Sequence, residues 1–385
     1  MIRIGIEQAK LDQLVSRHKA YFSKNLMNKR LEVHFKTAEL DIPTFPSTKQ
    51  DYMSKKYIRF FSYLRLKMDD ILAGEPKKLQ DIIDHIETNY RDLPFRSFSE
   101  IDGNVKKKAE KEKQADENKE DEGKETKQSN LFRSLTKIFN YTTFTKSGVW
   151  CAYDLALGLR LSICPYCNRQ YIHSHQDETL KIRATLDHFY DKGTYPFLAL
   201  SFYNLIPSCY FCNSILKHKK AFSINTHLHP YLHGFEDDIQ FYVKFRGQQG
   251  AKLDYTSILR ADPETFSLGF RFRKGSDLTI KKKAGHNIHD FKLKELYKVH
   301  KDYISEIIHK SVVYNDDFIQ GLFRSHPRLF TSEEEISRMV LGNYIQPQSQ
   351  DRRVLSKLTR DVAIQLGLAQ KLVFPNYYKV LRRRK

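Results

Sequence analysis

Two pairs of cysteines constrain the fold of this chain more than any other feature of its sequence. Cys164 and Cys167 form one CxxC pair, Cys209 and Cys212 form the other, and residues 168–208 lie between them. Thiolates at this spacing can both face one tetrahedral zinc ion, and two such pairs complete a closed site that leaves no place for substrate. The sequence therefore predicts a structural Zn²⁺ in the middle of the chain. Four buried thiols without a metal are the alternative.

The composition narrows the class of partner and the compartment. The 385 residues include 65 Lys and Arg against 46 Asp and Glu, which gives a formal net charge of +19. Such an excess favours a polyanionic partner such as nucleic acid. The longest apolar run, residues 148–164, is interrupted by Asp154 and Arg160 and is too short to cross a bilayer. Because the few cysteines are spaced for a metal, we expect a cytoplasmic protein without membrane contact.

Residues 104–130 differ in composition from the rest of the chain. They contain no aromatic residue and only one aliphatic residue larger than alanine, Val105, so they cannot form a core face. Their eight lysines and eight acidic residues cancel, which leaves the whole net charge on the remainder of the chain. We predict a charged, disordered linker here. The alternative is a solvated single helix supported by Glu–Lys pairs four residues apart.

The spacing of apolar residues predicts an α+β fold that is mostly α. Apolar residues three and four apart predict helices before the linker, directly after it and near the C-terminus. Alternating apolar residues predict strands at 239–245 and 266–272. We therefore expect four parts: a helical N-terminal region (1–103), the linker (104–130), a central domain with the zinc site (131–235), and a mixed, then mainly helical C-terminal region (236–385).

A second pattern lies between and beside the cysteine pairs. The sequence TLDHFYDK occupies 185–192, Asn204 precedes the second cysteine pair, and Asn213 follows the last cysteine. Hydrolysis of a phosphodiester needs a base that deprotonates water and a cation that stabilises charge on the phosphate. His188 suits the base because an imidazole titrates near neutral pH. Carboxylate and amide oxygens suit Mg²⁺ or Mn²⁺.

These motifs together resemble the HNH endonucleases of the ββα-metal fold. The resemblance covers roughly residues 163–220 and implies a small zinc-stapled nuclease core within 131–235. It implies that His188 is the general base and that Asn204 bridges a loop that holds His188 in line. It also implies that Asp187, at a bent strand end, and Asn213 hold the catalytic Mg²⁺ or Mn²⁺. His218 lies one residue beyond the simplest helical register with Asn213, so a ligand role for it stays open.

Lys217, Lys219 and Lys220 follow this motif, and we expect them to contact phosphates, the alternative being a solvated charged face. Further short segments are similar to bacterial anti-phage defence HNH proteins of the Septu and retron-associated type, which act beside an ATPase partner. The resemblance thus implies an effector nuclease acting on nucleic acid, with DNA favoured over RNA. The alternative is a non-catalytic zinc-ribbon module that binds nucleic acid or protein. It explains the cysteines and the charge but not the spacing of Asp187 and His188.

Overall fold

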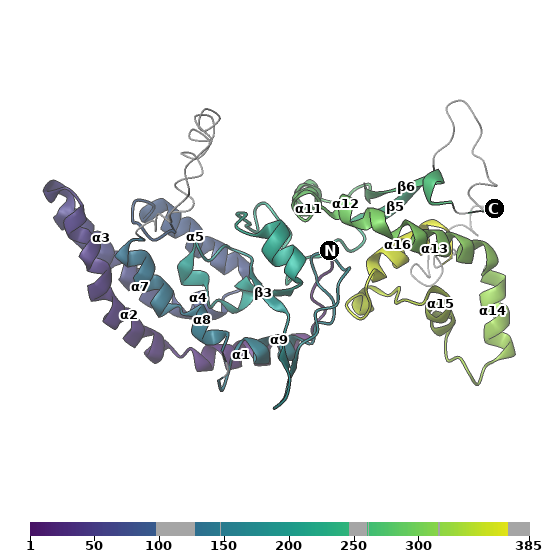
Figure 1. Cartoon of the computed structure of the whole chain (residues 1–385), viewed down its shortest axis with the longest axis horizontal. Helices are drawn as coiled ribbons and strands as arrows, with labels where there is room; N and C mark the ends of the chain where they lie inside the picture. The colour runs from purple at the N-terminus through teal and green to yellow at the C-terminus, as the bar shows by residue number, and fades with distance from the viewer. Residues whose placement is uncertain (98–127, 147, 246–259, 261, 315, 369–385) are drawn as a thin grey trace, which may run out of the picture.

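The computed structural model describes residues 1–97, 128–146, 148–245, 260, 262–314 and 316–368. These residues form an α+β structure that is mostly helical, as predicted. The molecule is elongated, with the first helices at one end, the last helices at the other, and the segment with β3 between them (Figure 1). Residues 104–127 of the predicted linker lie outside the described residues. Across the described ranges, the helices are too short or too polar to span a membrane.

The N-terminal region is built from helices. They are α1 (Gln8–Tyr21), α2 (Lys24–Ala38), η1 (Glu39–Thr44), α3 (Ser47–Leu66), α4 (Met68–Ala73) and α5 (Pro76–Asn89). Three more follow the predicted linker: α7 (Asn130–Ile138), α8 (Tyr141–Phe144) and α9 (Ala152–Leu159). The backbone N–H groups of Asn130 and Leu131 donate to the buried carboxylate of Asp41 at 2.9 and 2.8 Å. A carboxylate at a helix N-terminus satisfies free donors, so Asp41 holds α7 against the earlier helices.

Short strands and turns make up the segment with the cysteine pairs. They are β1 (His175–Gln176), β2 (Lys181–Ile182), β3 (Thr185–His188), η3 (Pro196–Leu198), η4 (Phe202–Asn204), β4 (Leu205–Ser208) and the π-helix η5 (Phe211–Lys217). β3 pairs with β4 in antiparallel register, so that Asp187 lies opposite Ile206 and His188 opposite Leu205. η5 follows β4 after two residues and packs against β3.

The C-terminal region contains one hairpin and a group of helices. Its elements are β5 (Ile239–Phe245), η6 (Pro263–Thr265), β6 (Phe266–Phe272), α11 (Leu278–Asp290), α12 (Leu293–Tyr297), η7 (Lys298–His300), α13 (Lys301–Val313), α14 (Asp316–Ser325), α15 (Glu333–Leu341), η8 (Pro347–Ser349) and α16 (Ser356–Gln365). β5 and β6 pair antiparallel over the residues predicted for them. α16 packs on β5, where the Phe241 N–H donates to the Asp361 carboxylate at 2.8 Å.

The first cysteine pair anchors the C-terminal region. Asn168, directly after Cys167, has a φ of 52° and is fully buried. Its amide donates to the Gln350 carbonyl at 3.1 Å, and its side-chain oxygen accepts from the Lys357 N–H at 3.0 Å. The Tyr297 hydroxyl donates to the Cys167 carbonyl at 2.6 Å. The cysteine segment therefore holds helices and loops of the C-terminal region in place.

Candidate active site

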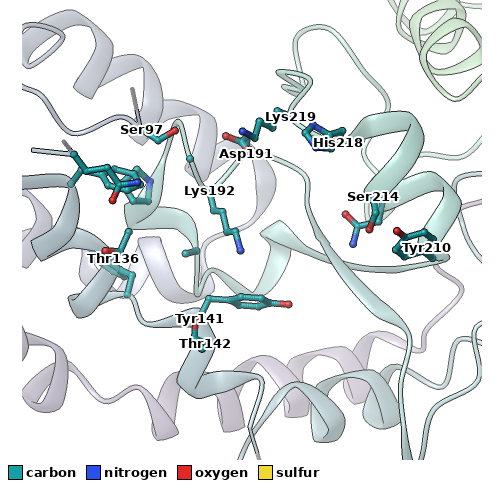
Figure 2. Close-up of a pocket in the computed structure, with 17 residues that line it drawn as sticks. Ser97, Thr136, Tyr141, Thr142, Asp191, Lys192, Tyr210, Ser214, His218 and Lys219 are labelled. Carbon is teal, nitrogen blue, oxygen red and sulfur yellow. The ribbon is translucent and has the colours of Figure 1, made fainter. Parts of the chain in front are cut away.

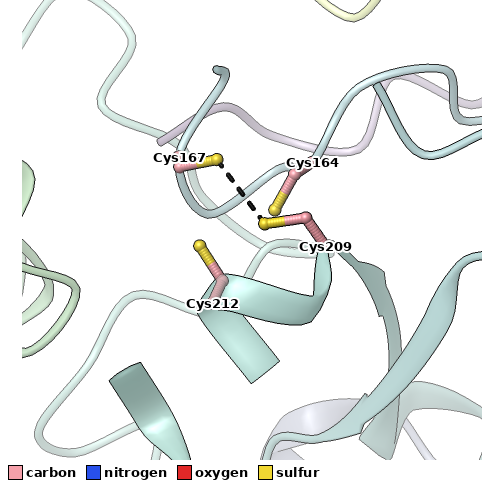
Figure 3. A group of neighbouring side chains, drawn as sticks. All are labelled: Cys164, Cys167, Cys209 and Cys212. Atoms are coloured by element: carbon pink, nitrogen blue, oxygen red, sulfur yellow. Dashed lines mark hydrogen bonds between the residues drawn. The ribbon is translucent and has the colours of Figure 1, made fainter. Parts of the chain in front are cut away.

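The four cysteines of the two pairs come together, as predicted. Their sulfur atoms all lie within 4.8 Å of one another and all four residues are buried (Figure 3). The Cys167 and Cys209 Sγ atoms are 3.9 Å apart, close to the ~3.8 Å edge of a tetrahedron with zinc–sulfur bonds of about 2.3 Å. The Arg169 N–H also donates to the Cys167 sulfur at 3.4 Å. The donor set and its burial fit a metal ion such as zinc.

The cysteine cluster lies next to a pocket that contains most of the predicted reaction residues. This pocket, here called the reaction pocket, has a volume of about 290 Å³ and is lined by Asp187, His188, Asn213 and His218. Asp187 and His188 end strand β3, whereas Asn213 lies in η5 directly after Cys212. Successive residues of a strand normally point to opposite faces, yet both strand residues line this pocket. A bend at the strand end, which the resemblance implies, would account for this arrangement and stays a prediction.

Asp187 is buried and both of its carboxylate oxygens have partners. The Tyr166 hydroxyl donates to Oδ2 at 2.6 Å, and the Lys217 ammonium lies 3.0 Å from Oδ1. Burial, and then the Asp187 charge, raise the pKa of Tyr166 well above its usual value, so that the phenol stays a donor. The same Lys217 ammonium donates to the His188 carbonyl at 2.6 Å. The buried Lys217 ammonium thus contacts both Asp187 and His188.

The structure corrects the prediction that Lys217 contacts phosphate at the surface. Its side chain is 1% exposed and faces Asp187 rather than solvent. The other two lysines of the run are exposed, but they differ in their partners. Lys220 donates to the backbone carbonyl of Asp290 at 3.1 Å and lies 3.3 Å from its carboxylate. Lys219 lines a second hollow beside the reaction pocket.

His188 is held in one orientation and one tautomer. Its Nε2 lies 3.0 Å from the Ala199 carbonyl oxygen, which can only accept, so Nε2 carries the proton and Nδ1 keeps a free lone pair. The Tyr141 ring meets the imidazole edge-on at 4.5 Å between centroids. Burial, and then the charge of Lys192, lower the pKa of His188 to about 3. The imidazole is therefore neutral at pH 7, as a general base must be, but it is a weaker base than the near-neutral imidazole that the sequence leads us to expect.

Asn204 connects the backbone on both sides of the loop that follows His188. Its Oδ1 accepts from the Tyr190 N–H at 2.7 Å, and its Nδ2 donates to the carbonyls of Tyr190 and Leu198 at 3.1 and 3.0 Å. Leu198 directly precedes Ala199, whose carbonyl fixes the imidazole. A fully buried side chain with every polar atom bonded is a rigid support.

The π-helix explains how Asn213 and His218 reach the same pocket. The His218 N–H donates to the Asn213 carbonyl at 2.9 Å, so the bond spans five residues instead of the four of an α-helix. This wider turn removes the one-residue offset that the sequence implies for an α-helical register. Neither side chain forms a hydrogen bond with another residue in the part of the chain that the structure describes. Both are therefore available to a ligand.

Sequence reasoning gave no role to several residues that line the reaction pocket, among them Tyr141, Arg183 and Lys192. Tyr141 comes from α8, and Arg183 precedes β3. Lys192 belongs to the TLDHFYDK motif, but the motif alone gives it no role. Burial raises the pKa of Tyr141 to about 12, so its hydroxyl keeps its proton. The Arg183 guanidinium donates to the Ala184 carbonyl at 3.0 Å and lies over the Tyr153 ring.

The oxygen donors of the reaction pocket fit a hard divalent cation. Asp187 offers a carboxylate, whose two oxygens have about four lone-pair sites, and Asn213 offers an amide oxygen without a partner among the described residues. Lys217 already places a positive charge on the same carboxylate, so a cation bound there would meet repulsion from the ammonium.

Comparisons of this chain with protein-family models, with curated proteins and with solved structures find no match. A functional assignment therefore rests on the residues of the reaction pocket.

Proposed function

We propose that this chain is a metal-dependent endonuclease of the HNH type, which hydrolyses phosphodiester bonds of nucleic acid, DNA in preference to RNA. One observation carries the proposal: Asp187, His188 and Asn213 line a single pocket, and Asn213 directly follows Cys212 of the buried cysteine cluster. A cluster of buried thiols with no role in catalysis would not require a pocket lined by these three residues. A carboxylate, a neutral imidazole and an amide oxygen are the groups that metal-assisted hydrolysis uses.

His188 acts as the general base. Its Nε2–H is engaged by the Ala199 carbonyl, so Nδ1 is the atom that takes the proton from the attacking water. Asn204 fixes the neighbouring carbonyl of Leu198, which keeps this loop in place. The ring of Tyr141 packs against the imidazole and limits its rotation. The position of Nδ1 is thus set before substrate arrives, which lowers the entropic cost of the reaction.

Asp187 and Asn213 would hold Mg²⁺ or Mn²⁺, with His218 as a third candidate ligand on the same wall. When bound, the cation supplies charge that stabilises the phosphate and the leaving oxygen. Lys192 and Arg183 line the same pocket and orient the phosphate by direct charge attraction. A zinc ion held by the four cysteines would support this arrangement because Cys212 directly precedes Asn213.

The net charge of +19 supports nucleic acid as the substrate class, since phosphate contacts supply most of the non-specific binding free energy. The resemblance to anti-phage defence nucleases supports an effector role, action beside an ATPase partner and a cytoplasmic location. These are parts of the same proposal.

A second candidate function is a non-catalytic zinc module that binds nucleic acid or protein. One observation favours it: both oxygens of Asp187 already have protein partners, and Lys217 supplies a cation without any metal. In this case the buried pair would be a purely structural ion pair.

The test is incubation of the purified chain with supercoiled plasmid, single-stranded DNA and RNA, each with Mg²⁺, with Mn²⁺ and without added metal. The proposal expects cleavage that depends on the divalent cation. Protein that binds these nucleic acids but cuts none of them in either metal would favour the non-catalytic module.

A further inference from the structure

A larger hollow of about 800 Å³, here called the outer hollow, lies beside the reaction pocket. The two spaces share five lining residues, so they are adjacent. These residues are Tyr141, Asp191, Lys192, Asn213 and His218. A strand whose phosphate lies beside His188 therefore has a built space for its neighbouring nucleotide.

Two separate parts of the chain form the walls of the outer hollow. Thr136 of α7 and Tyr141 of α8 stand on one side, and Tyr210 and Ser214 at η5 stand on the other, with Lys192 pointing into the space between them (Figure 2). The first side lies outside residues 163–220, which carry the HNH motifs. The outer hollow is thus a feature that the motif alone does not contain.

The lining of the outer hollow matches the chemistry of a nucleotide. Tyr210 presents a ring that is 61% exposed, and Tyr141 offers a second ring. Lys192 and Lys219 supply positive charge, and several hydroxyl groups supply hydrogen bonds. Asp191, the one acidic lining residue among those that the structure describes, already accepts from the Thr194 N–H at 2.9 Å and from its hydroxyl at 3.1 Å. Stacking surface, hydroxyls and ammonium groups together suit base, sugar and phosphate.

The outer hollow has the size of a site for one nucleotide. Its volume lies within the range of about 300–1,000 Å³ that is typical of sites for one drug-sized ligand, and a nucleotide belongs to this size class. A base can reach Tyr141 and Tyr210 only after it has left its stacked neighbours, which costs a few kcal/mol in a duplex and little in a single strand.

We infer that the outer hollow binds an unstacked nucleotide next to the scissile phosphate, so that single-stranded nucleic acid is the substrate of the proposed nuclease. This inference rests on the proposed function for the place of the scissile phosphate.

Binding tests the inference in the full-length chain that carries His188→Ala, which prevents cleavage. The probe is a fluorescein-labelled DNA of about 12 nucleotides, single-stranded or annealed to its complement, followed by anisotropy at fixed salt. We expect the single strand to bind at least ~10-fold more tightly than the duplex. Tyr210→Ala should weaken single-strand binding by about 5- to 100-fold, since stacking contributes roughly 1–3 kcal/mol per base.

Matched variants separate stacking from a general disturbance. Tyr210→Phe keeps the ring and should bind as the parent does. Tyr52→Ala removes a tyrosine of similar exposure, 57%, from α3 and should change nothing. Equal affinity for duplex and single strand, or an unchanged affinity of Tyr210→Ala, would overturn the inference.

Cleavage by the wild-type chain distinguishes this failure from failure of the proposed function. If the protein cuts duplex as fast as single strands, the nuclease proposal stands and the role inferred for the outer hollow is wrong. If Tyr210-dependent single-strand binding is found but no metal supports cleavage, the nuclease proposal fails and the nucleotide site remains.

Discussion

Lys217→Met tests the buried ion pair at the centre of the proposed site. The substitution keeps the length and apolar stem of the side chain but removes the ammonium group. Asp187, 2% exposed, then keeps the Tyr166 hydroxyl but no longer has a cation beside it, and the His188 carbonyl loses a donor. Removal of one member of a buried ion pair typically costs about 3–5 kcal/mol, because the other charge stays buried and uncompensated.

The expected shift in melting temperature follows from the length of the chain. Unfolding entropy of about 2.1 cal/mol/K per residue gives roughly 0.8 kcal/mol/K for 385 residues that unfold together. The loss of about 3–5 kcal/mol then lowers the melting temperature by about 4–6 °C. Differential scanning calorimetry without Mg²⁺ or Mn²⁺ measures this shift. Lys219→Met is the matched control, since this lysine is exposed, and it should melt within about 1 °C of the wild type.

A double variant and added metal sharpen the test. Asp187→Asn combined with Lys217→Met removes both charges, so it should lose less stability than the sum of the two single variants. Mn²⁺ should restore part of the stability of Lys217→Met, because it replaces the lost positive charge, and should bind this variant more tightly than the wild type. A melting temperature of Lys217→Met equal to that of Lys219→Met would refute the assigned role of the pair.

Three further predictions concern the metal cluster, the core and the basic surface. Elemental analysis should find one zinc per chain. Cys167→Ser should lose this zinc and unfold the central segment, since structural zinc contributes on the order of 10 kcal/mol to folding. A folded, metal-free chain would contradict this prediction. Burial lowers the pKa of His18 from its usual 6.5 to about 4, so the folded state favours neutral imidazole; the contribution of His18 to stability is complete above pH 6.5 and should fall by about 3 kcal/mol as the pH falls toward 4, and His188, whose pKa is also lowered, adds to this loss. Trp150, the single tryptophan, donates to His18 Nδ1 at 3.0 Å, so its fluorescence reports the unfolding of this site. Urea unfolding followed by this fluorescence at each pH measures the change in stability. Equal stability at pH 7 and pH 4 would contradict the prediction. Lys219→Gln should reduce the slope of log affinity for single-stranded DNA against log salt by about 0.7, whereas Lys220→Gln should reduce it less because Asp290 already binds that ammonium; the reverse order would place the phosphate contact elsewhere.

Local periodicity predicts the regular elements of this chain well. The alternation of apolar residues marks β5 and β6 at their observed bounds, and in β5 it matches a buried and a less buried face, whereas in β6 only Phe266 is buried. Residues 6–26 have helical spacing throughout, but the structure divides them between α1 and α2. The Ser23 hydroxyl accepts from the Leu26 N–H at 3.4 Å and caps a new helix. Apolar spacing alone does not reveal such a cap within a continuous pattern.

The sequence predicts which residues carry the chemistry of the site better than it predicts the residues that contact them. Cys164 and Asp187 lie in motifs whose spacing indicates their function, and the structure brings them to adjacent sites. Lys217 looks like part of a solvated charge run, because only the fold shows that a carboxylate faces it. Tyr141 reaches the pocket from a helix far away in the sequence. His218 depends on a π-turn that α-helical register does not anticipate.

The cleavage rate of His188→Ala, compared with that of the wild type, tests the proposed nuclease mechanism more directly than any other measurement. Both proteins are prepared in parallel and assayed under single-turnover conditions with Mg²⁺ on the same nucleic acid. We expect a loss of at least ~100-fold, the lower end of the usual contribution of a general base, with zinc content and nucleic-acid affinity unchanged. A His188→Ala protein that cuts within about threefold of the wild-type rate would contradict the assignment of His188 as the base. Removal of the group that accepts the proton of the attacking water should lower the rate by far more than this.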